Sequence, residues 1–545
     1  MANYTMRADG TAANLAAALG GDPTVASECL SLAGYNSYGA GASPGDHFQL
    51  ADDGGDYRGT LSVVEAGTSG NEYVYEAYSG DTPILNGSDL IVTWSDEGSD
   101  IWSAAVTTEP QQVWMDGTFG DRQEDLVSCV NEYDWFWESN VLKVFAASDP
   151  DTRYTSPGVE AGARNTCLST KSYVIIDGLT FSKSNAINIY SYQTSYLTVR
   201  NCTSEWAWEH GARFSTDVAA SNLLVEDCTF SYCGANGIAG LVTESGTFDD
   251  VVVRRNKCNE NGRHQYKQPV WTSTHGFSGA MKFFGTFVPV GGWRFYENLC
   301  YDNGPAAVTY NESSRGQGIW MDAVDGASDD PVQIYHNLIY DTHGCGVFIE
   351  LCSYNDVHNN VIYNCATGSN IDNHWASGGI RVDTRLNFVI DNVNVYNNTI
   401  AGCWIGIHAT AYNMGSCEFN DCNFKNNICS GNDIELRVSD GADNDTYGSG
   451  NVYKNNCLGA EAADFISWGG STYSTYDAWL AASSQTDNNI ESDPSFTDAG
   501  SDDYTLGAAS PCIGAGENLG SPYDAALLPA SSWTAAVVTG SQDDY

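Results

Sequence analysis

The sequence predicts an all-β solenoid, in which short strands stack as successive turns of one coil. Three observations predict it. An apolar strand that ends in Asn or Asp recurs from residue 172 onward, and the shortest interval, between Asn337 and Asn360, is 23 residues. A second strand follows a Gly in each repeat and alternates apolar with polar or aromatic residues. The composition, with 56 Gly and 31 Tyr, favours turns and strands over long helices.

The first third of the chain, residues 1–170, does not repeat. Short strands are expected at 45–50, 60–64, 73–78 and 141–145, and aromatic residues crowd the stretch between Trp94 and Trp137. We interpret this region as a cap followed by an inserted, mostly β subdomain. A cap is needed because the open end of a coil exposes its core and the unpaired edges of its strands.

The repeating region, residues 171–460, forms the coil itself. Parallel strands one turn apart lie about 4.8 Å from each other. An Asn at the same corner of every turn can therefore satisfy the backbone groups of that corner and also bond the Asn of the next turn. The strand-ending residues are Asn201, Asp227, Asn256, Asn298, Asn337, Asn360, Asn398, Asn427 and Asn456.

Cysteines recur at one point of the repeat. The chain has 17 Cys, an odd number, so at least one of them has no disulfide partner. Buried free Cys behaves as a small apolar residue, so a stack of inward-facing thiols is the main interpretation and a few disulfides are the alternative. The recurring positions are Cys202, Cys228, Cys258, Cys300, Cys429 and Cys457.

The repeats from 172 to 460 resemble the right-handed parallel β-helix of the pectate-lyase-like superfamily. The closing run at 493–516 is similar to the terminal segment of many bacterial and phage β-helix proteins, and residues 4–18 resemble the N-termini of phage-associated and marine members. The resemblance implies a right-handed parallel β-helix at 171–460, with the N-terminal cap and β subdomain at 1–170 and a C-terminal closing segment at 461–545. It leaves the activity open, because this fold carries lyases, hydrolases, epimerases and inert fibres.

The charge excludes one class of partner. With 23 Lys and Arg against 69 Asp and Glu, the formal net charge is −46, whereas nucleic-acid binding needs a basic face. No run of 18 apolar residues predicts a membrane span, and the first residues show no basic-then-apolar signal segment. We expect an extracellular protein or one carried on a virion such as a phage tail.

Three copies of the Gly-led strand carry the candidate catalytic acids. They are residues 318–322, 346–350 and 379–383, which end in Asp322, Glu350 and Asp383. If the copies stack, these side chains form a column on the outer face. Carboxylates on adjacent turns would lie about 5 Å apart, and those on alternate turns about 9–10 Å apart, which fits retaining and inverting glycoside hydrolysis respectively. Like charges at such distances also separate their pKa values, so that one acid keeps its proton.

The same outer positions carry side chains suited to sugars. Trp320 and Phe348 would stack on pyranose faces, and Arg213, Lys282 and Arg381 would hold hydroxyl groups or a carboxylate. These cations stand out in a chain that has so few.

Three further residues complete the substrate-binding set. His408 occupies the equivalent outer position one repeat after Arg381, and His374 and Trp375 lie in the segment before Gly379, from which they would close over the site. For most of these outer positions the plainer alternative is a solvated surface side chain.

A metal is an alternative at one place. Asp325, Asp329 and Asp330 follow Asp322 within a span of nine residues and offer the oxygen ligands that Ca²⁺ prefers, although their spacing does not match the EF-hand loop. No cofactor is otherwise expected.

Together these observations predict an enzyme that degrades a polysaccharide or cell-surface glycan, a glycoside hydrolase that uses paired carboxylates on adjacent turns. The first alternative is a polysaccharide lyase, with or without Ca²⁺, in which Arg381 or Lys282 is the base. The second is a glycan-binding fibre or adhesin without catalysis, such as a phage tail fibre. The resemblance to phage tailspikes also implies a homotrimer.

Overall fold

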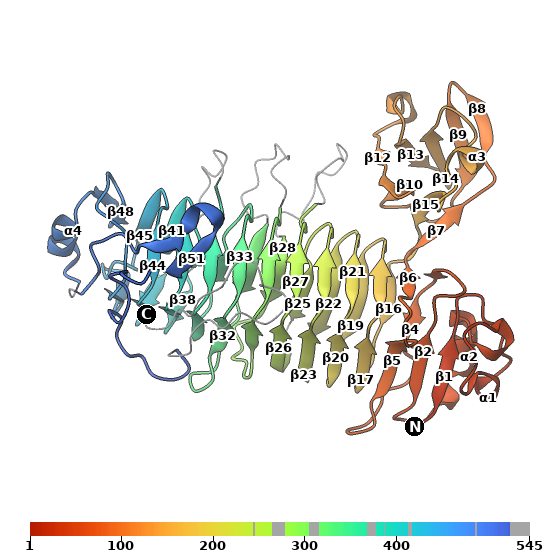
Figure 1. Cartoon of the computed structure of the whole chain (residues 1–545), viewed down its shortest axis with the longest axis horizontal. Helices are drawn as coiled ribbons and strands as arrows, with labels where there is room; N and C mark the ends of the chain where they lie inside the picture. The colour runs from red at the N-terminus through yellow and green to blue at the C-terminus, as the bar shows by residue number, and fades with distance from the viewer. Residues whose placement is uncertain are drawn as a thin grey trace.

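The structure, a computed structural model, describes residues 1–243, 246–263, 278–304, 316–367, 378–385, 387–412, 417–485 and 488–523. The chain winds into a long coil with three parallel sheets along its sides, which confirms the predicted solenoid (Figure 1). We call the sheets A, B and C.

Each sheet gains one strand from each turn. Sheet A contains β1 (Asn3–Met6), β2 (His47–Leu50), β5 (Tyr73–Ala77), β17 (Val174–Asp177), β20 (Leu197–Arg200), β23 (Ala219–Glu226), β26 (Thr247–Arg254), β29 (Arg294–Tyr296), β32 (Val332–Tyr335), β35 (Asn355–His358), β39 (Asn394–Tyr396), β43 (Asn423–Lys425) and β47 (Val452–Lys454). Sheet B contains β3 (Tyr57–Arg58), β6 (Ile84–Asn86), β18 (Thr180–Ser182), β21 (Thr203–Glu205), β24 (Thr229–Ser231), β27 (Lys257–Asn259), β30 (Leu299–Tyr301), β33 (Leu338–Tyr340), β36 (Val361–Tyr363), β40 (Thr399–Ala401) and β44 (Ile428–Ser430). Sheet C contains β4 (Leu61–Ser62), β16 (Thr166–Ser169), β19 (Ile187–Tyr192), β22 (His210–Thr216), β25 (Ile238–Val242), β28 (Gly279–Phe284), β31 (Gln317–Asp322), β34 (Val347–Glu350), β37 (Ile380–Arg385), β41 (Ile405–Tyr412), β45 (Ile434–Ser439), β48 (Ile466–Trp468) and the antiparallel β49 (Ser471–Tyr473). A small side sheet is formed by β38 (Val389–Asp391), β42 (Glu418–Asn420) and β46 (Gly448–Ser449).

The coil begins well before residue 171. β1, β2 and β5 already stack in sheet A, and β5 pairs in parallel with β17. The first turns are hard to recognise in the sequence because their corners lack the later motif. The corner between β5 and β6, for example, consists of the six residues 78–83 and contains no Asn, whereas only Asn201 and Cys202 separate the corresponding strands β20 and β21.

The predicted subdomain is inserted between β6 and β16, at the passage from sheet B to sheet C, and it projects from the coil (Figure 1). A buried carboxylate, Glu160, joins it to the coil through ion pairs with Arg58 (2.8 Å) and Lys183. Its elements are β7 (Ser88–Ile91), β8 (Ser95–Gly98), β9 (Ile101–Ala105), β10 (Val113–Met115), β11 (Thr118–Phe119), β12 (Asp121–Arg122), η3 (Leu126–Ser128), β13 (Asp134–Glu138), β14 (Val141–Phe145), α3 (Pro150–Arg153) and β15 (Val159–Gly162).

Short helices lie at the two ends of the coil (Figure 1). The N-terminal end carries α1 (Leu15–Ala18), η1 (Ala26–Glu28), α2 (Leu32–Tyr38) and η2 (Gly39–Gly41). The C-terminal end carries α4 (Tyr476–Ser483). The segment that follows contains β50 (Phe496–Asp498), η4 (Ala499–Ser501) and β51 (Asp503–Leu506), and it packs on sheet B, where Tyr504 lies against Tyr363. In the described ranges no helix has the length and apolar character that crossing a membrane requires.

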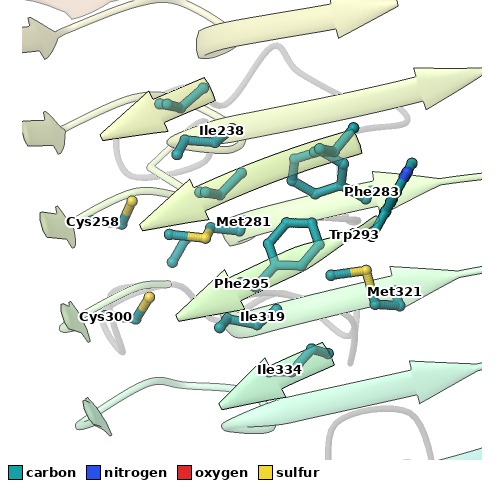
Figure 2. Packing of buried hydrophobic residues seen from close by; sticks show 14 of the residues in the cluster. Ile238, Cys258, Met281, Phe283, Trp293, Phe295, Cys300, Ile319, Met321 and Ile334 are labelled. Carbon is teal, nitrogen blue, oxygen red and sulfur yellow. The ribbon is translucent and has the colours of Figure 1, made fainter. Parts of the chain in front are cut away.

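The interior is filled by the alternate residues of each strand, as the period of two requires. Figure 2 shows Ile238, Met281 and Ile319 from successive strands of sheet C in one inward row. Phe283 meets Phe295 of sheet A edge to face, with ring centroids 4.8 Å apart. Phe283 is in register with Gly240, where a Cβ atom would lie 2.1 Å from the ring, so this large side chain requires glycine on the neighbouring strand.

The corner asparagines form the predicted ladder. Asn337 shows the pattern: its backbone N–H and its side-chain amide both donate to Asn360 Oδ1, each at 3.0 Å. The residue before each rung has a left-handed backbone, as at His336, which turns the Asn side chain under the next turn. The rungs are Cys202, Cys228, Asn256, Asn298, Asn337, Asn360, Asn398, Asn427, Asn456 and Asn489.

The cysteines follow the main interpretation of the sequence. All 17 are free and buried. Cys258 and Cys300 are in register on adjacent strands of sheet B and lie in one inward row (Figure 2). The thiols therefore act as small apolar side chains, and two of them also replace Asn in the ladder.

The ladder predicts a stability effect. Replacing Asn360, which is fully buried, with Ala leaves the N–H of Asn337 and the carbonyls of Ile334 and His358 without their partner. An unsatisfied buried group costs about 1–3 kcal/mol, so we expect urea denaturation to show at least that loss in the free energy of unfolding. The exposed turn residue Asn71 is the control, and its change to Ala should alter stability by less than about 0.5 kcal/mol. Equal effects at both positions would contradict the ladder's role.

A buried histidine predicts an acid effect. His358 lies 1% exposed in sheet A, stacked on Tyr335, and burial lowers its pKa from 6.5 to about 4. Because the folded pKa is depressed, the stabilising contribution is present above pH 6.5 and is lost as the pH falls to 4. The free energy of unfolding of the wild type should fall by about 3 kcal/mol relative to that of His358→Gln over this range. Denaturation curves at pH 7 and pH 4 that keep a constant difference would contradict it.

Candidate active site

The three acids lie side by side in sheet C. Asp322 ends β31 and is in register with Glu350, which ends β34, and Glu350 is in register with Asp383 of β37. A second row of side chains lies two residues earlier on each strand. It runs from Lys282 through Trp320, Phe348 and Arg381 to His408 on successive strands. The predicted register is therefore confirmed, including the one-residue shift at the start of β28.

Each acid has its own cation. Lys282 Nζ lies 2.9 Å from Asp322 Oδ2, and Arg381 donates to Asp383 Oδ2 from Nε at 3.0 Å and from Nη2 at 2.8 Å. The third pair joins Glu350 to Arg385. Sequence reasoning did not find Arg385, although it lies two residues after Asp383 on the same strand, and strand alternation carried one step further would have placed it on this face.

The site is more enclosed than expected. The side chains of Glu350 and Asp383 are 1% and 0% exposed, whereas Asp322 and Lys282 keep 12% and 14%. These acids are thus not the solvated surface carboxylates of the plainer alternative, and the pairing with cations is what makes their burial tolerable.

Burial moves several pKa values. It raises the pKa of Asp383, whose pair with Arg381 opposes the rise, and the nearby charge of Asp322 adds to it. Asp383 Oδ1 has no hydrogen-bond partner among the described residues, which agrees with that direction. Burial lowers the pKa of Lys282 and of Arg385, against the attraction of Asp322.

The two aromatic residues are not open platforms, which corrects the expectation that they stack on sugars. Trp320 and Phe348 are each 1% exposed, and their rings stack on each other with centroids 5.3 Å apart. Lys282 Nζ lies 3.4 Å from the centre of the Trp320 ring, and the Arg381 guanidinium lies 5.5 Å from that of Phe348. Trp320 Nε1 also donates to Glu350 Oε2 at 3.0 Å. The rings therefore hold the charged side chains in place.

The remaining substrate-binding candidates are only partly gathered here. His408 is buried next to Arg381, with Nδ1 3.5 Å from Nη1. Arg213 lies on β22, two strands before Lys282, where it donates to Ser215 Oγ at 3.1 Å, so it is separate from the acids. His374 and Trp375 lie outside the described residues.

The row also continues past His408 in a way that the sequence analysis missed. Arg437 of β45 is in register with His408, and Ser439 is in register with Thr410. Burial, together with Arg381, lowers the pKa of Arg437. The sequence of β45 predicts this continuation, because Arg437 and Ser439 are two residues apart and therefore lie on one face of the strand.

The weak metal candidates do not converge. Asp325 accepts a hydrogen bond from the backbone N–H of Ser353 at 2.7 Å, and Asp330 pairs with Arg294. Within the described ranges no three His, Cys, Asp or Glu side chains are grouped so that they could hold a metal ion. Asp329 lies in the same turn and adds no such group, so nothing in this part of the chain supports a Ca²⁺ site.

Comparison with known proteins identifies the fold. Residues 155–278 match the family described as "Right handed beta helix region", and residues 329–520 match the family described as "Disaggregatase related". The chain is therefore a right-handed parallel β-helix. No curated protein matches it.

Solved structures agree with this fold. The structure titled "The complex structure of XylC with xylose" superimposes with a TM-score of 0.54 at 14% identity, over 78% of this chain and 75% of that one. A structure titled "Glycoside hydrolase" gives a TM-score of 0.50 at 10% identity, over 84% and 96%. At these identities the likeness concerns the fold alone.

The buried pair Arg381–Asp383 predicts a coupled stability effect. Arg381→Met or Asp383→Leu alone leaves a buried charge without its partner and should cost about 3–5 kcal/mol in the free energy of unfolding, whereas the double variant should lose much less than the sum. The partly exposed pair Arg200–Asp177 serves as the control, where Arg200→Met should cost at most about 1 kcal/mol. Additive losses in urea denaturation would contradict the coupling.

Proposed function

We propose that the protein is a polysaccharide-degrading enzyme, a glycoside hydrolase that uses Asp322 and Glu350. The observation that carries this proposal is the in-register pair of acids at the ends of β31 and β34, each of which is paired with a partly buried cation. Burying charged groups costs free energy, and clusters of such groups are found most often at functional sites.

The surroundings of Glu350 suit an ionised carboxylate. Arg385 donates to its Oε1 and Trp320 donates to its Oε2, and both hydrogen bonds favour the charged form. In the proposal Glu350 is therefore the nucleophile or base. Asp322 is the carboxylate that faces the leaving oxygen in this proposal, because it is the most exposed of the three.

Asp383 takes a positioning role in this proposal. It is fully buried and holds Arg381 through two hydrogen bonds from within its own strand. Adjacent strands lie about 4.8 Å apart, which favours the ~5–5.5 Å separation of a retaining mechanism for Asp322 and Glu350.

One observation supports a second candidate, a polysaccharide lyase. The lowered pKa of Lys282 makes its amine a better base than an ordinary lysine, and it lies beside Asp322 at the exposed side of the site. A lyase would use Lys282 to remove the proton next to a uronate carboxylate. Because the polysaccharide substrates of hydrolases and lyases lie outside cells, we propose an extracellular or virion-borne setting for the enzyme.

The test is turnover on soluble xylan, polygalacturonate and alginate. Asp322→Asn and Glu350→Gln should each lower kcat by at least about 100-fold while the fold, followed by circular dichroism, is unchanged. Lys257→Gln, which removes a lysine on the neighbouring sheet B, is the control and should leave kcat unchanged.

The product distinguishes the two chemistries. A hydrolase releases reducing ends without absorbance near 235 nm, whereas a lyase produces an unsaturated sugar that absorbs there. Binding of glycan without cleavage by the wild type would contradict both and would favour an adhesin.

A further inference from the structure

Two phenylalanines are unusually exposed beside the acids. Of the Phe and Trp side chains in the described ranges, only Phe284 and Phe287 are more than about a third exposed, at 38% and 37%. Phe284 ends β28 and is in register with Asp322 on the next strand. The exposed aromatic surface is therefore at the same row as the candidate acid, whereas Trp320 is buried.

A third ring connects this surface to the far side of the acid pair. Phe287, just after β28, stacks on Phe388, just after β37, with ring centroids 4.3 Å apart and planes at 16°. β31 and β34 lie between those two strands in sheet C, and they end at Asp322 and Glu350. The stacked rings consequently span the ends of the two strands that carry the acids.

Backbone hydrogen bonds fix the rings to the acid-bearing turns. The N–H of Phe287 donates to the carbonyl of Ala323, directly after Asp322, at 3.1 Å. On the other side the N–H of Phe388 donates to the carbonyl of Arg385, the partner of Glu350, at 3.2 Å. The residue next to Asp322 thus positions Phe287, and the ion-pair partner of Glu350 positions Phe388.

Scattered apolar residues on a protein surface are ordinary and need no function. These rings differ because they come from strands that are not neighbours, stack on each other, and gather at one charged site. An aromatic surface beside polar groups matches a sugar ring, whose axial C–H face is apolar and whose edge carries hydroxyl groups.

We propose that Phe284, Phe287 and Phe388 form the surface on which a pyranose ring of the substrate packs, next to the bond that is cleaved. This inference rests on the proposed function, and it assigns to these three rings the sugar contact expected of Trp320 and Phe348. Since Phe284 continues the row of Asp322 along the coil, the polysaccharide lies along the coil axis.

The experiment measures steady-state kinetics of the full-length enzyme on whichever of xylan, polygalacturonate or alginate the wild type cleaves. Phe284→Ala and Phe287→Ala should each raise KM about five- to tenfold with kcat within about twofold, and Phe284→Trp should restore KM. Tyr196→Ala, which removes a 42% exposed ring elsewhere, should leave KM unchanged. Thermal melting checks that each variant is folded.

The outcomes separate this inference from the proposed function. An unchanged KM in Phe284→Ala and Phe287→Ala overturns the aromatic surface, even when Asp322→Asn has lost turnover. Turnover that survives in Asp322→Asn and Glu350→Gln overturns the proposed acids, and a raised KM in the Phe variants then still supports the aromatic surface. If the wild type neither cleaves nor is retarded by any of the three polysaccharides in affinity electrophoresis, both fail.

Discussion

The constant register of the parallel strands is the constraint on which the rest of the structure depends. One strand per turn at a spacing of about 4.8 Å brings residues that are 28 and 33 positions apart, Asp322, Glu350 and Asp383, into one row. The corner ladder keeps this register, because each Asn bonds both to its own turn and to the next. A slip of one residue would turn every acid into the core.

The charged outer face of sheet C is stable because each acid is paired with a cation, and two of these cations also lie against aromatic rings. Burial disfavours the charged forms of Asp383, Lys282 and Arg385, and the ion pairs oppose this effect. Trp320 and Phe348 contribute by lying against cations instead of against solvent. Of the three carboxylates, Asp322 keeps the most contact with solvent, and the cations Lys282 and Arg385 are also partly exposed.

The fold and the register were predictable from the sequence because both follow from a period. Alternation placed Lys282 next to Trp320, and the recurring corner residue predicted the ladder. What was missed depends on contacts that have no period. The burial of Trp320 follows from its neighbours on other strands, the pairing of Arg385 with Glu350 spans 35 residues, and the Phe287–Phe388 stack joins two loops. The early start of the coil was missed because its corners lack the recurring motif, as in the six residues 78–83 between β5 and β6, which contain no Asn.

The most direct test of the central claim is the crystal structure of Glu350→Gln soaked with an oligosaccharide of a polysaccharide that the wild type cleaves. The account predicts sugar density on the outer face of sheet C, with one glycosidic oxygen within hydrogen-bond distance of Asp322 and a sugar ring against Phe284 or Phe287. Sugar density confined to sheet A, to sheet B or to the inserted subdomain, with the acid row unoccupied, would contradict it.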